Sequence, residues 1–234
     1  MTLTNFLVAI NVVVFIWQIS TGAGIAENNY TGTLVGVYVL DRGEWYRVVT
    51  SAFMHANLAH IGLNMIALLQ VGNIVEQLYG KARFALVYAL AIVGSGLAIV
   101  YFTPNQATLG ASGAIFGLFG ALVAVGIRMG SRGRSLIGQV IPVLAINLVF
   151  TFTVPGISAA AHVGGLLSGF IAGLVLYMVP SRRRAYAYAY APGGDPGAET
   201  IEQTPEVETI EQPPDAGAHE EEGAPPPHLR DPRE

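Results

Sequence analysis

The stretch Gly110-Ala111-Ser112-Gly113-Ala114-Ile115-Phe116-Gly117 opens an apolar run that extends to Ile127. It places one hydroxyl among small residues where a helix is expected to begin. Because glycine has no side chain, a neighbouring helix or a substrate backbone can approach such a serine closely. Two properties of the rest of the chain decide what this serine does: whether it lies in lipid, and whether another residue could activate it.

The composition indicates a membrane protein. The chain has 234 residues, of which 52% are hydrophobic and only 12% are charged, with a mean hydropathy of +0.50. A soluble domain carries about 25% charged residues. The absence of cysteine excludes disulfides, a thiolate nucleophile and cysteine metal ligands. Nothing in the sequence indicates a cofactor, a metal or a nucleic-acid partner.

The charges divide the chain into two parts, although the net charge is only −4. Residues 1–180 carry seven basic and four acidic side chains, whereas residues 181–234 carry five and twelve. The second part is rich in Pro, Glu, Ala and Gly, and the pentapeptide at 199–203 recurs at 208–212. Such a segment buries too little apolar surface to offset its chain entropy. We expect a membrane core over 1–180 and a disordered acidic tail over 181–234. His219 and His228 lie in that tail and are expected to have no catalytic role.

Six apolar segments predict an all-α membrane protein, a bundle of six transmembrane helices. Each is close to the ~20 residues that a helix needs to cross the hydrocarbon core, and helices satisfy their own backbone hydrogen bonds there. The first has no basic region and no cleavage site, so we expect a retained span rather than a signal peptide. The segments are Thr4–Ser20, Leu58–Leu78, Phe84–Thr103, Ala111–Ile127, Leu136–Thr153 and Ala159–Val179.

Basic residues predict the orientation of these spans, because lysine and arginine accumulate on the cytoplasmic side. If the N-terminus is cytoplasmic, the cytoplasmic connections and the start of the tail carry eight basic residues, and the outer connections carry only Arg42 and Arg47. Both termini are therefore expected in the cytoplasm. The long outer connection 21–54 holds Trp45-Tyr46-Arg47, which suits an element at the lipid headgroups. An ordinary aqueous loop is the alternative.

Three separate segments then place polar residues in the same outer layer. His55, His60 and Asn64 lie at the outer end of the second span, Ser112 at that of the fourth, and His162 about one turn into the sixth. A lone serine in a membrane helix usually bonds to its own backbone, and a lone histidine usually bonds to a neighbouring helix. At matched depth, however, the two form a nucleophile and its base.

The acids of residues 1–180 lie in the outer loop or, as Glu76 does, at the cytoplasmic end of a span, so a Ser112–His162 dyad is favoured over a triad. His60 and Asn64 share a helical face and, with the Ser112 N–H at a helix start, could stabilise an oxyanion. Small residues at 113, 117, 165, 169 and 173 would let the fourth and sixth spans approach closely.

These motifs resemble those of the rhomboid family of intramembrane serine proteases. Gly110-Ala111-Ser112-Gly113 matches the family's Gly-x-Ser-Gly motif, and Ala161-His162 with Gly165 and Gly169 is similar to its Ala-His-x-x-Gly-x-x-x-Gly motif. The spacing of His55, His60 and Asn64 is similar to the element His-x4-His-x3-Asn. Trp45-Tyr46-Arg47 looks like the first-loop tryptophan and arginine with one residue inserted.

The resemblance implies roles and a substrate class. Ser112 would be the nucleophile, His162 its base, and His60, Asn64 and the Ser112 N–H the oxyanion donors. His55, Gly110 and Gly113 would support the site, and Trp45 and Arg47 would belong to a structure at the membrane surface. The family cleaves transmembrane helices of other membrane proteins near their outer ends. The small six-span core favours a plasma membrane as the localisation, with an organelle membrane as the alternative. The segment Thr153–Ser158, with Pro155 and Gly156, could act as a mobile cover.

Two alternatives remain. A catalytically silent relative that binds membrane helices would be expected to lack the serine or the histidine, and both are present here. A small transporter or metal site could use His55, His60 and His162. These have no carboxylate nearby and no His-Glu-x-x-His signature.

Overall fold

The computed structural model describes residues 1–178 and is helical throughout this range, apart from loops and one bridge between Leu34 and Thr108. Predictions about the tail, including its disorder and its boundary at 180, lie outside the described residues. The elements are α1 Leu3–Thr21, α2 Gly36–Arg42, α3 Arg47–Thr50, the 3-10 turn η1 Ser51–Phe53, α4 Leu58–Tyr79, α5 Lys81–Phe102, α6 Ser112–Arg128, the 3-10 turn η2 Gly130–Gly133, α7 Arg134–Thr153 and α8 Ala159–Met178.

The six predicted segments are confirmed as the six long helices, with ends displaced by no more than a few residues. Five of them (α1, α4, α5, α7 and α8) are long and apolar enough to cross a membrane. The sixth, α6, is apolar but has only 17 residues, about 25 Å at 1.5 Å per residue. The protein is therefore an integral membrane protein with an all-helical bundle fold.

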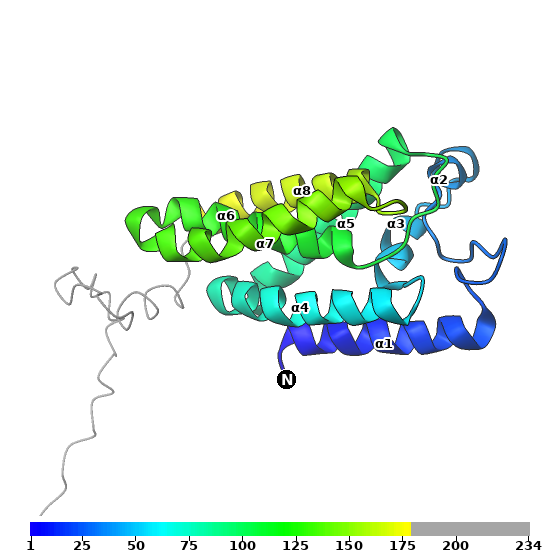
Figure 1. The fold of residues 1–234 in the computed structure, drawn as a ribbon, viewed down its shortest axis with the longest axis horizontal. Coiled ribbons are helices and arrows are strands. Elements are labelled where there is room, and N and C mark those ends of the chain that lie inside the picture. The colour runs from blue at the N-terminus through cyan, green and yellow to red at the C-terminus, as the bar shows by residue number, and fades with distance from the viewer. Residues whose placement is uncertain (179–234) are drawn as a thin grey trace, which may run out of the picture. The chain divides into compact units, whose positions relative to one another are not determined.

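Helix α6 is the centre of this bundle. Thirteen of its residues are buried, and it packs against α4, α5, α7 and α8. Helix α1 lies at the edge and packs along α4, whereas α7 and α8 lie with α6 on the opposite side of α4 (Figure 1). A short helix can occupy the centre because its neighbours, not lipid, surround it.

Glycines bring α6 and α8 together, as their spacing predicts. A Cβ added to Gly165 would overlap the carbonyl oxygen of Gly113, and one added to Gly169 would overlap that of Gly117. On the other side of α6, a Cβ on Gly113 would overlap the Ser95 hydroxyl of α5. The absence of side chains at these positions therefore fixes the distance between the helices that carry Ser112 and His162.

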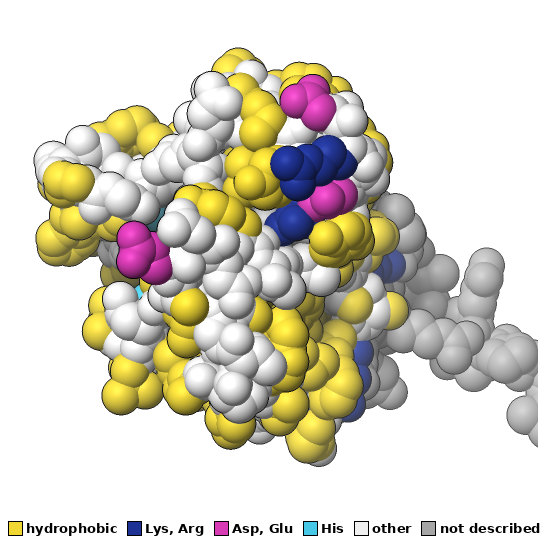
Figure 2. Space-filling model, turned by 90° about the vertical axis from the view of Figure 1, so that its right-hand side faces the viewer, with side chains coloured by type: hydrophobic (Ala, Val, Ile, Leu, Met, Phe, Trp, Pro, Cys, Tyr) yellow, Lys and Arg dark blue, Asp and Glu magenta, His cyan; other side chains and the backbone are white. Residues whose placement is uncertain are grey.

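The connection between α1 and α4 folds into α2, α3 and η1, which cover one end of the bundle near the starts of α4 and α8 (Figure 1). Arg47 is buried there and donates to the carbonyl oxygens of Tyr30 and Thr33, the latter at 2.7 Å, and to the Glu44 carboxylate. Trp45 beside it is 48% exposed. Figure 2 looks onto this end and shows basic and acidic side chains gathered in one group, with a further acidic side chain lying apart from it. The position of this element at the lipid headgroups remains a prediction.

Candidate active site

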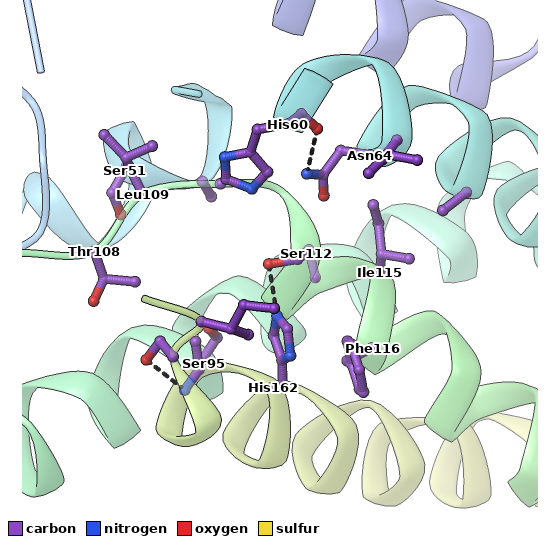
Figure 3. Close-up of a pocket in the computed structure, with 18 of the residues that line it drawn as sticks. Ser51, His60, Asn64, Ser95, Thr108, Leu109, Ser112, Ile115, Phe116 and His162 are labelled. Atoms are coloured by element: carbon purple, nitrogen blue, oxygen red, sulfur yellow. Dashed lines mark hydrogen bonds between the residues drawn. The ribbon is translucent and has the colours of Figure 1, made fainter. Parts of the chain in front are cut away.

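Ser112 and His162 are hydrogen-bonded to each other. The Ser112 Oγ lies 2.8 Å from Nε2 of His162, so the first residue of α6 meets a residue in the first turn of α8, fifty positions along the chain (Figure 3). His162 is only 8% exposed. An imidazole nitrogen at this distance can accept the serine proton, which gives the pair the geometry of a nucleophile and its base.

Two further residues hold the His162 ring, and sequence reasoning missed both. Phe116 stacks on the ring with centroids 4.1 Å apart and planes 14° from parallel. Thr151 Oγ1 lies 2.7 Å from His162 Nδ1. Phe116 is four residues after Ser112 and so shares its helical face, a signal that could have identified it. No sequence signal distinguishes Thr151, because only the packing of α7 on α8 brings it to the histidine.

His60 and Asn64 face Ser112 from α4, on the side of the serine opposite to His162 (Figure 3). The Asn57 side chain caps α4 by accepting from the His60 backbone N–H at 2.9 Å, which fixes His60 in the first turn. The Ala56 N–H donates to His60 Nδ1 at 3.4 Å, so the proton of the neutral ring resides on Nε2. Asn64 donates one amide N–H to the His60 carbonyl at 2.8 Å and retains a second.

Gly110 allows His60 to approach the nucleophile. Its φ is +133°, in the region that favours glycine, and a Cβ there would lie 2.9 Å from the His60 ring. Its N–H donates to the Ser51 carbonyl at 2.9 Å, which anchors the approach to α6. Because α6 begins at Ser112, the N–H of Ser112 belongs to the first turn and has no acceptor within the helix.

A cavity of about 950 Å³ is lined by the side chains of Ser112, His162, His60 and Asn64, among others. The cavity extends between α4 and α7, where apolar residues such as Ile74 and Val140 form its walls, and residues 155–158 of the α7–α8 connection line it as well. Next to Ser112, Gly113 packs on Ser95, which lies seven residues before the end of α5. Ser112 is therefore recessed by roughly 10 Å from that end. A small part of a histidine side chain is visible from that end of the bundle (Figure 2).

His55 stands behind His60 and does not line the cavity. Its ring meets that of His60 edge-on, with centroids 5.2 Å apart, and its backbone N–H donates to Gln18 Oε1 of α1 at 2.8 Å. Burial, with a smaller contribution from His60, lowers the pKa of His55 to about 4. His55 is therefore a neutral side chain at neutral pH, and its ring packs against that of His60.

The other predicted supporting residues are placed differently. Gly113 lies at the contact of α6 with α5 and α8, whereas Trp45 and Arg47 belong to the element over the end of the bundle and line no part of this cavity. The Glu76 carboxylate accepts from the N–H groups of Leu3 and Thr4 and from the Thr4 hydroxyl, at 2.8–2.9 Å. Glu76 therefore caps the N-terminal end of α1 and does not contact His162. The partner of His162 Nδ1 is the hydroxyl of Thr151, not a carboxylate.

Metal ligation has no basis in the described part of the chain. Within residues 1–178, no three His, Cys, Asp or Glu side chains are grouped in a way that could hold a metal ion. Both ring nitrogens of His162 are engaged, by Ser112 and by Thr151. Residues 1–178 therefore offer no ligand set for the metal-site alternative.

Comparison with known proteins identifies the family of this chain. The family model of the rhomboid domain matches residues 42–179, more than half of the chain. The chain belongs to the rhomboid family. The matched region contains the long helices from α4 onward and Arg47. It also contains Ser112, His162, His60 and Asn64.

Individual rhomboid relatives are similar over most of this chain. It is 34% identical to "Putative rhomboid protease YdcA" of Bacillus subtilis over 67% of this chain and 78% of that protein. It is 35% identical to "Rhomboid protease GluP" of the same bacterium over 75% of this chain. It is 31% identical to "RHOMBOID-like protein 6, mitochondrial" of Arabidopsis thaliana over 64% of this chain. The chain spans 35% of the length of GluP and 49% of that of the plant protein.

Proposed function

We propose that this chain is an intramembrane serine endopeptidase that cleaves transmembrane helices of other membrane proteins through a Ser112–His162 dyad. The observation that carries the proposal is the 2.8 Å contact between Ser112 Oγ and His162 Nε2 inside a helical bundle that spans the membrane. Membership in the rhomboid family, and relatives whose names describe them as proteases, support it.

In the first step, His162 Nε2 takes the proton of Ser112 as Oγ attacks the carbonyl carbon of the scissile peptide bond. The negative charge that develops on the carbonyl oxygen needs donors at fixed positions. We assign this part to His60 Nε2–H, the second N–H of Asn64 and the backbone N–H of Ser112, three groups on residues that line the cavity. The tetrahedral intermediate then collapses, and His162 protonates the leaving amine.

In the second step, water hydrolyses the acyl-enzyme. His162 takes a proton from the water as its oxygen attacks the ester, and returns a proton to Ser112 Oγ when the ester bond breaks. Water must therefore reach a residue that lies below the end of α5. The cavity around the dyad is the proposed route, and a small part of a histidine side chain is visible from the end of the bundle that carries α2 and α3 (Figure 2). Thr153, the first residue of the predicted cover Thr153–Ser158, is the last residue of α7. The rest of that segment is the α7–α8 connection, whose residues 155–158 line the cavity, and this connection is the proposed mobile cover.

The substrate follows from the shape of the cavity. Its apolar part runs down between α4 and α7, both of which expose large hydrophobic side chains. A transmembrane segment could enter there from the lipid and present its outer end to Ser112 after local unwinding, because an intact helix shields its peptide bonds. The distribution of basic residues supports cytoplasmic termini and a site that opens toward the outer face, in a plasma membrane.

The test is cleavage by the full chain reconstituted in liposomes with a single-span substrate protein. Wild type should release one fragment cut near the outer end of the span, and Ser112→Ala and His162→Ala should release none. A fluorophosphonate should label wild type on Ser112. Cleavage that persists in Ser112→Ala overturns the dyad. Cleavage by neither wild type nor variant, with no labelling, favours a catalytically silent helix-binding relative.

A further inference from the structure

We propose that Thr151 is a positioning residue for His162. Its hydroxyl oxygen accepts a hydrogen bond from the Nδ1–H of His162, and the proton stays on Nδ1. Nε2 therefore keeps its lone pair and can act as the base. The inference rests on the proposed function, since a base is needed only if Ser112 is a nucleophile. It assigns to α7 a part in the chemistry that the dyad alone does not include.

The hydrogen bonds around Thr151 determine where the protons lie. Its Oγ1 donates to the Asn147 carbonyl at 2.7 Å, one turn earlier in α7, and lies 2.7 Å from His162 Nδ1. A hydroxyl has one proton to donate and two lone pairs. A carbonyl can only accept, so the hydroxyl proton points to Asn147 and a lone pair points to the histidine. His162 Nδ1 must then carry the proton of the neutral ring.

This assignment has a direct consequence at the other ring nitrogen. With Nδ1 protonated, Nε2 has a lone pair and accepts from the Ser112 hydroxyl, 2.8 Å away. In the opposite tautomer, Nε2 would donate to Ser112 and could not take its proton. The second nitrogen of a catalytic histidine commonly sets the tautomer in this way. Here a threonine linked to a backbone carbonyl takes the place that a carboxylate holds in a triad.

Thr151 is placed to contact His162 but not a substrate in the cavity. Thr151 is 3% exposed and is one of three buried residues of α7, together with Val140 and Leu144. It does not line the cavity, so it lies behind the ring, away from the scissile bond. Two residues further on, Thr153 makes the same bond to the carbonyl four residues earlier, Val149, at 2.7 Å, but is exposed and does not touch His162.

This pair of threonines provides a matched experiment in the full-length reconstituted protein. Thr151→Val removes the hydroxyl and keeps the shape, Thr151→Ser keeps the hydroxyl, and Thr153→Val removes an equivalent bond elsewhere on α7. We expect Thr151→Val to lower kcat roughly 10- to 100-fold, by analogy with the loss of a group that orients a metal-ligating histidine. KM should change little, because the substrate does not touch Thr151. Thr151→Ser and Thr153→Val should stay near wild type.

The ring tautomer is a readout that does not depend on activity. The ¹⁵N chemical shifts of His162 in ¹⁵N-histidine-labelled protein, assigned by difference from His162→Gln, should show the proton on Nδ1 in wild type and a redistribution toward Nε2 in Thr151→Val. A wild-type ring protonated on Nε2 overturns the inference. So does equal activity of the two valine variants, or a Thr151→Ser variant as impaired as Thr151→Val.

Failure of the proposed function would look different. In that case wild type would neither cleave the substrate nor react with a fluorophosphonate, whatever the tautomer. Thermal unfolding of each variant, measured in the same detergent, separates loss of folded protein from loss of the hydrogen bond.

Discussion

The carbonyl oxygen of Gly113 and the α-carbon of Gly165 are so close that a Cβ added to Gly165 would overlap the oxygen. Gly113 follows Ser112, and Gly165 lies three residues after His162. This contact therefore sets the separation of α6 and α8 at the depth of the dyad. The geometry of the site depends on a backbone-to-backbone approach that leaves no room for even one methyl group.

Gly165→Ala should consequently impair both stability and activity. The added methyl must push α8 away from α6, and overpacking of this kind costs about 1–3 kcal/mol. Since displacement of a reacting group by about 1 Å costs roughly 100-fold in rate, we expect a fall of that order in fluorophosphonate labelling of Ser112. Gly62→Ala in α4 is the control, because nothing lies within 4 Å of a Cβ there; wild-type labelling by Gly165→Ala would refute the argument.

The oxyanion donors should be required for kcat more than for KM. Asn64→Ala should lower kcat roughly 100- to 1,000-fold, the usual effect of removing one such donor. Asn73→Ala is the matched control: Asn73 bonds to the carbonyl of Leu69 four residues earlier on the same helix, at 2.7 Å, but does not line the cavity. Steady-state kinetics in liposomes would measure both, and equal values for the two variants would exclude Asn64 from the oxyanion site.

Gly110→Ala should disturb His60. The new methyl would lie 2.9 Å from the imidazole, and the backbone φ of +133° disfavours any side chain. We expect kcat to fall at least 10-fold, as misplacement of one donor implies. Gly43→Ala separates strain from steric contact, because Gly43 also has a positive φ, +70°, with open space around it. A Gly110→Ala enzyme no worse than Gly43→Ala would count against the contact.

His55 should make the folded protein sensitive to acid. Burial, more than the nearby His60, lowers the pKa of His55 to about 4 in the folded state, whereas an exposed histidine titrates near 6.5. The unfolded chain therefore binds the extra proton first as the pH falls from about 6.5 to about 4, and stability declines over that window. Above pH 6.5 this contribution is fully present. His55→Gln should show a smaller loss of Tm between pH 7 and pH 5 than wild type; an unchanged loss would contradict the assignment.

Tyr79→Phe should affect stability and leave chemistry intact. The Tyr79 hydroxyl shares its one proton between the carbonyl oxygens of Ala121 and Gly173, at 3.2 and 3.0 Å. This contact lies where the end of α4 meets α6 and α8, nine residues along α6 from Ser112. Loss of a buried hydrogen bond costs about 1–2 kcal/mol, so Tm should fall and kcat should not. Tyr101→Phe in α5 is the control, since Tyr101 is 64% exposed. A large loss of kcat in Tyr79→Phe would place this contact in the catalytic machinery.

Much of the fold was predictable because the bilayer restricts the options. A run such as Thr4–Ser20 can only be a helix in lipid, and it appears as α1, Leu3–Thr21. The connection 21–54 was harder to predict. Its polar and apolar residues follow no single period, and its short helices α2 and α3 are held by contacts such as those of Arg47 with the carbonyls of Tyr30 and Thr33.

The candidate site was predictable in part for the same reason. Polar residues within spans are costly in lipid and call for a functional or structural reason. The predicted depths of Ser112, His162, His60 and Asn64 were similar, so the sequence placed them in one layer of the membrane. Phe116 and Thr151 carry no such signal. An apolar ring and a helix threonine with a satisfied hydroxyl are ordinary in a span, and their contacts with His162 exist only in the packed bundle.

The sequence by itself determined the number and approximate limits of the six long helices, the glycines that let them approach, and the residue types available for chemistry. These are local properties, set by hydropathy, side-chain size and the cost of a polar group in lipid. Only the tertiary structure decided which nitrogen of His162 meets Ser112, which hydroxyl holds the other, and how close the helices come. Those are distances between segments far apart in the chain, and packing at the scale of a single methyl group sets them.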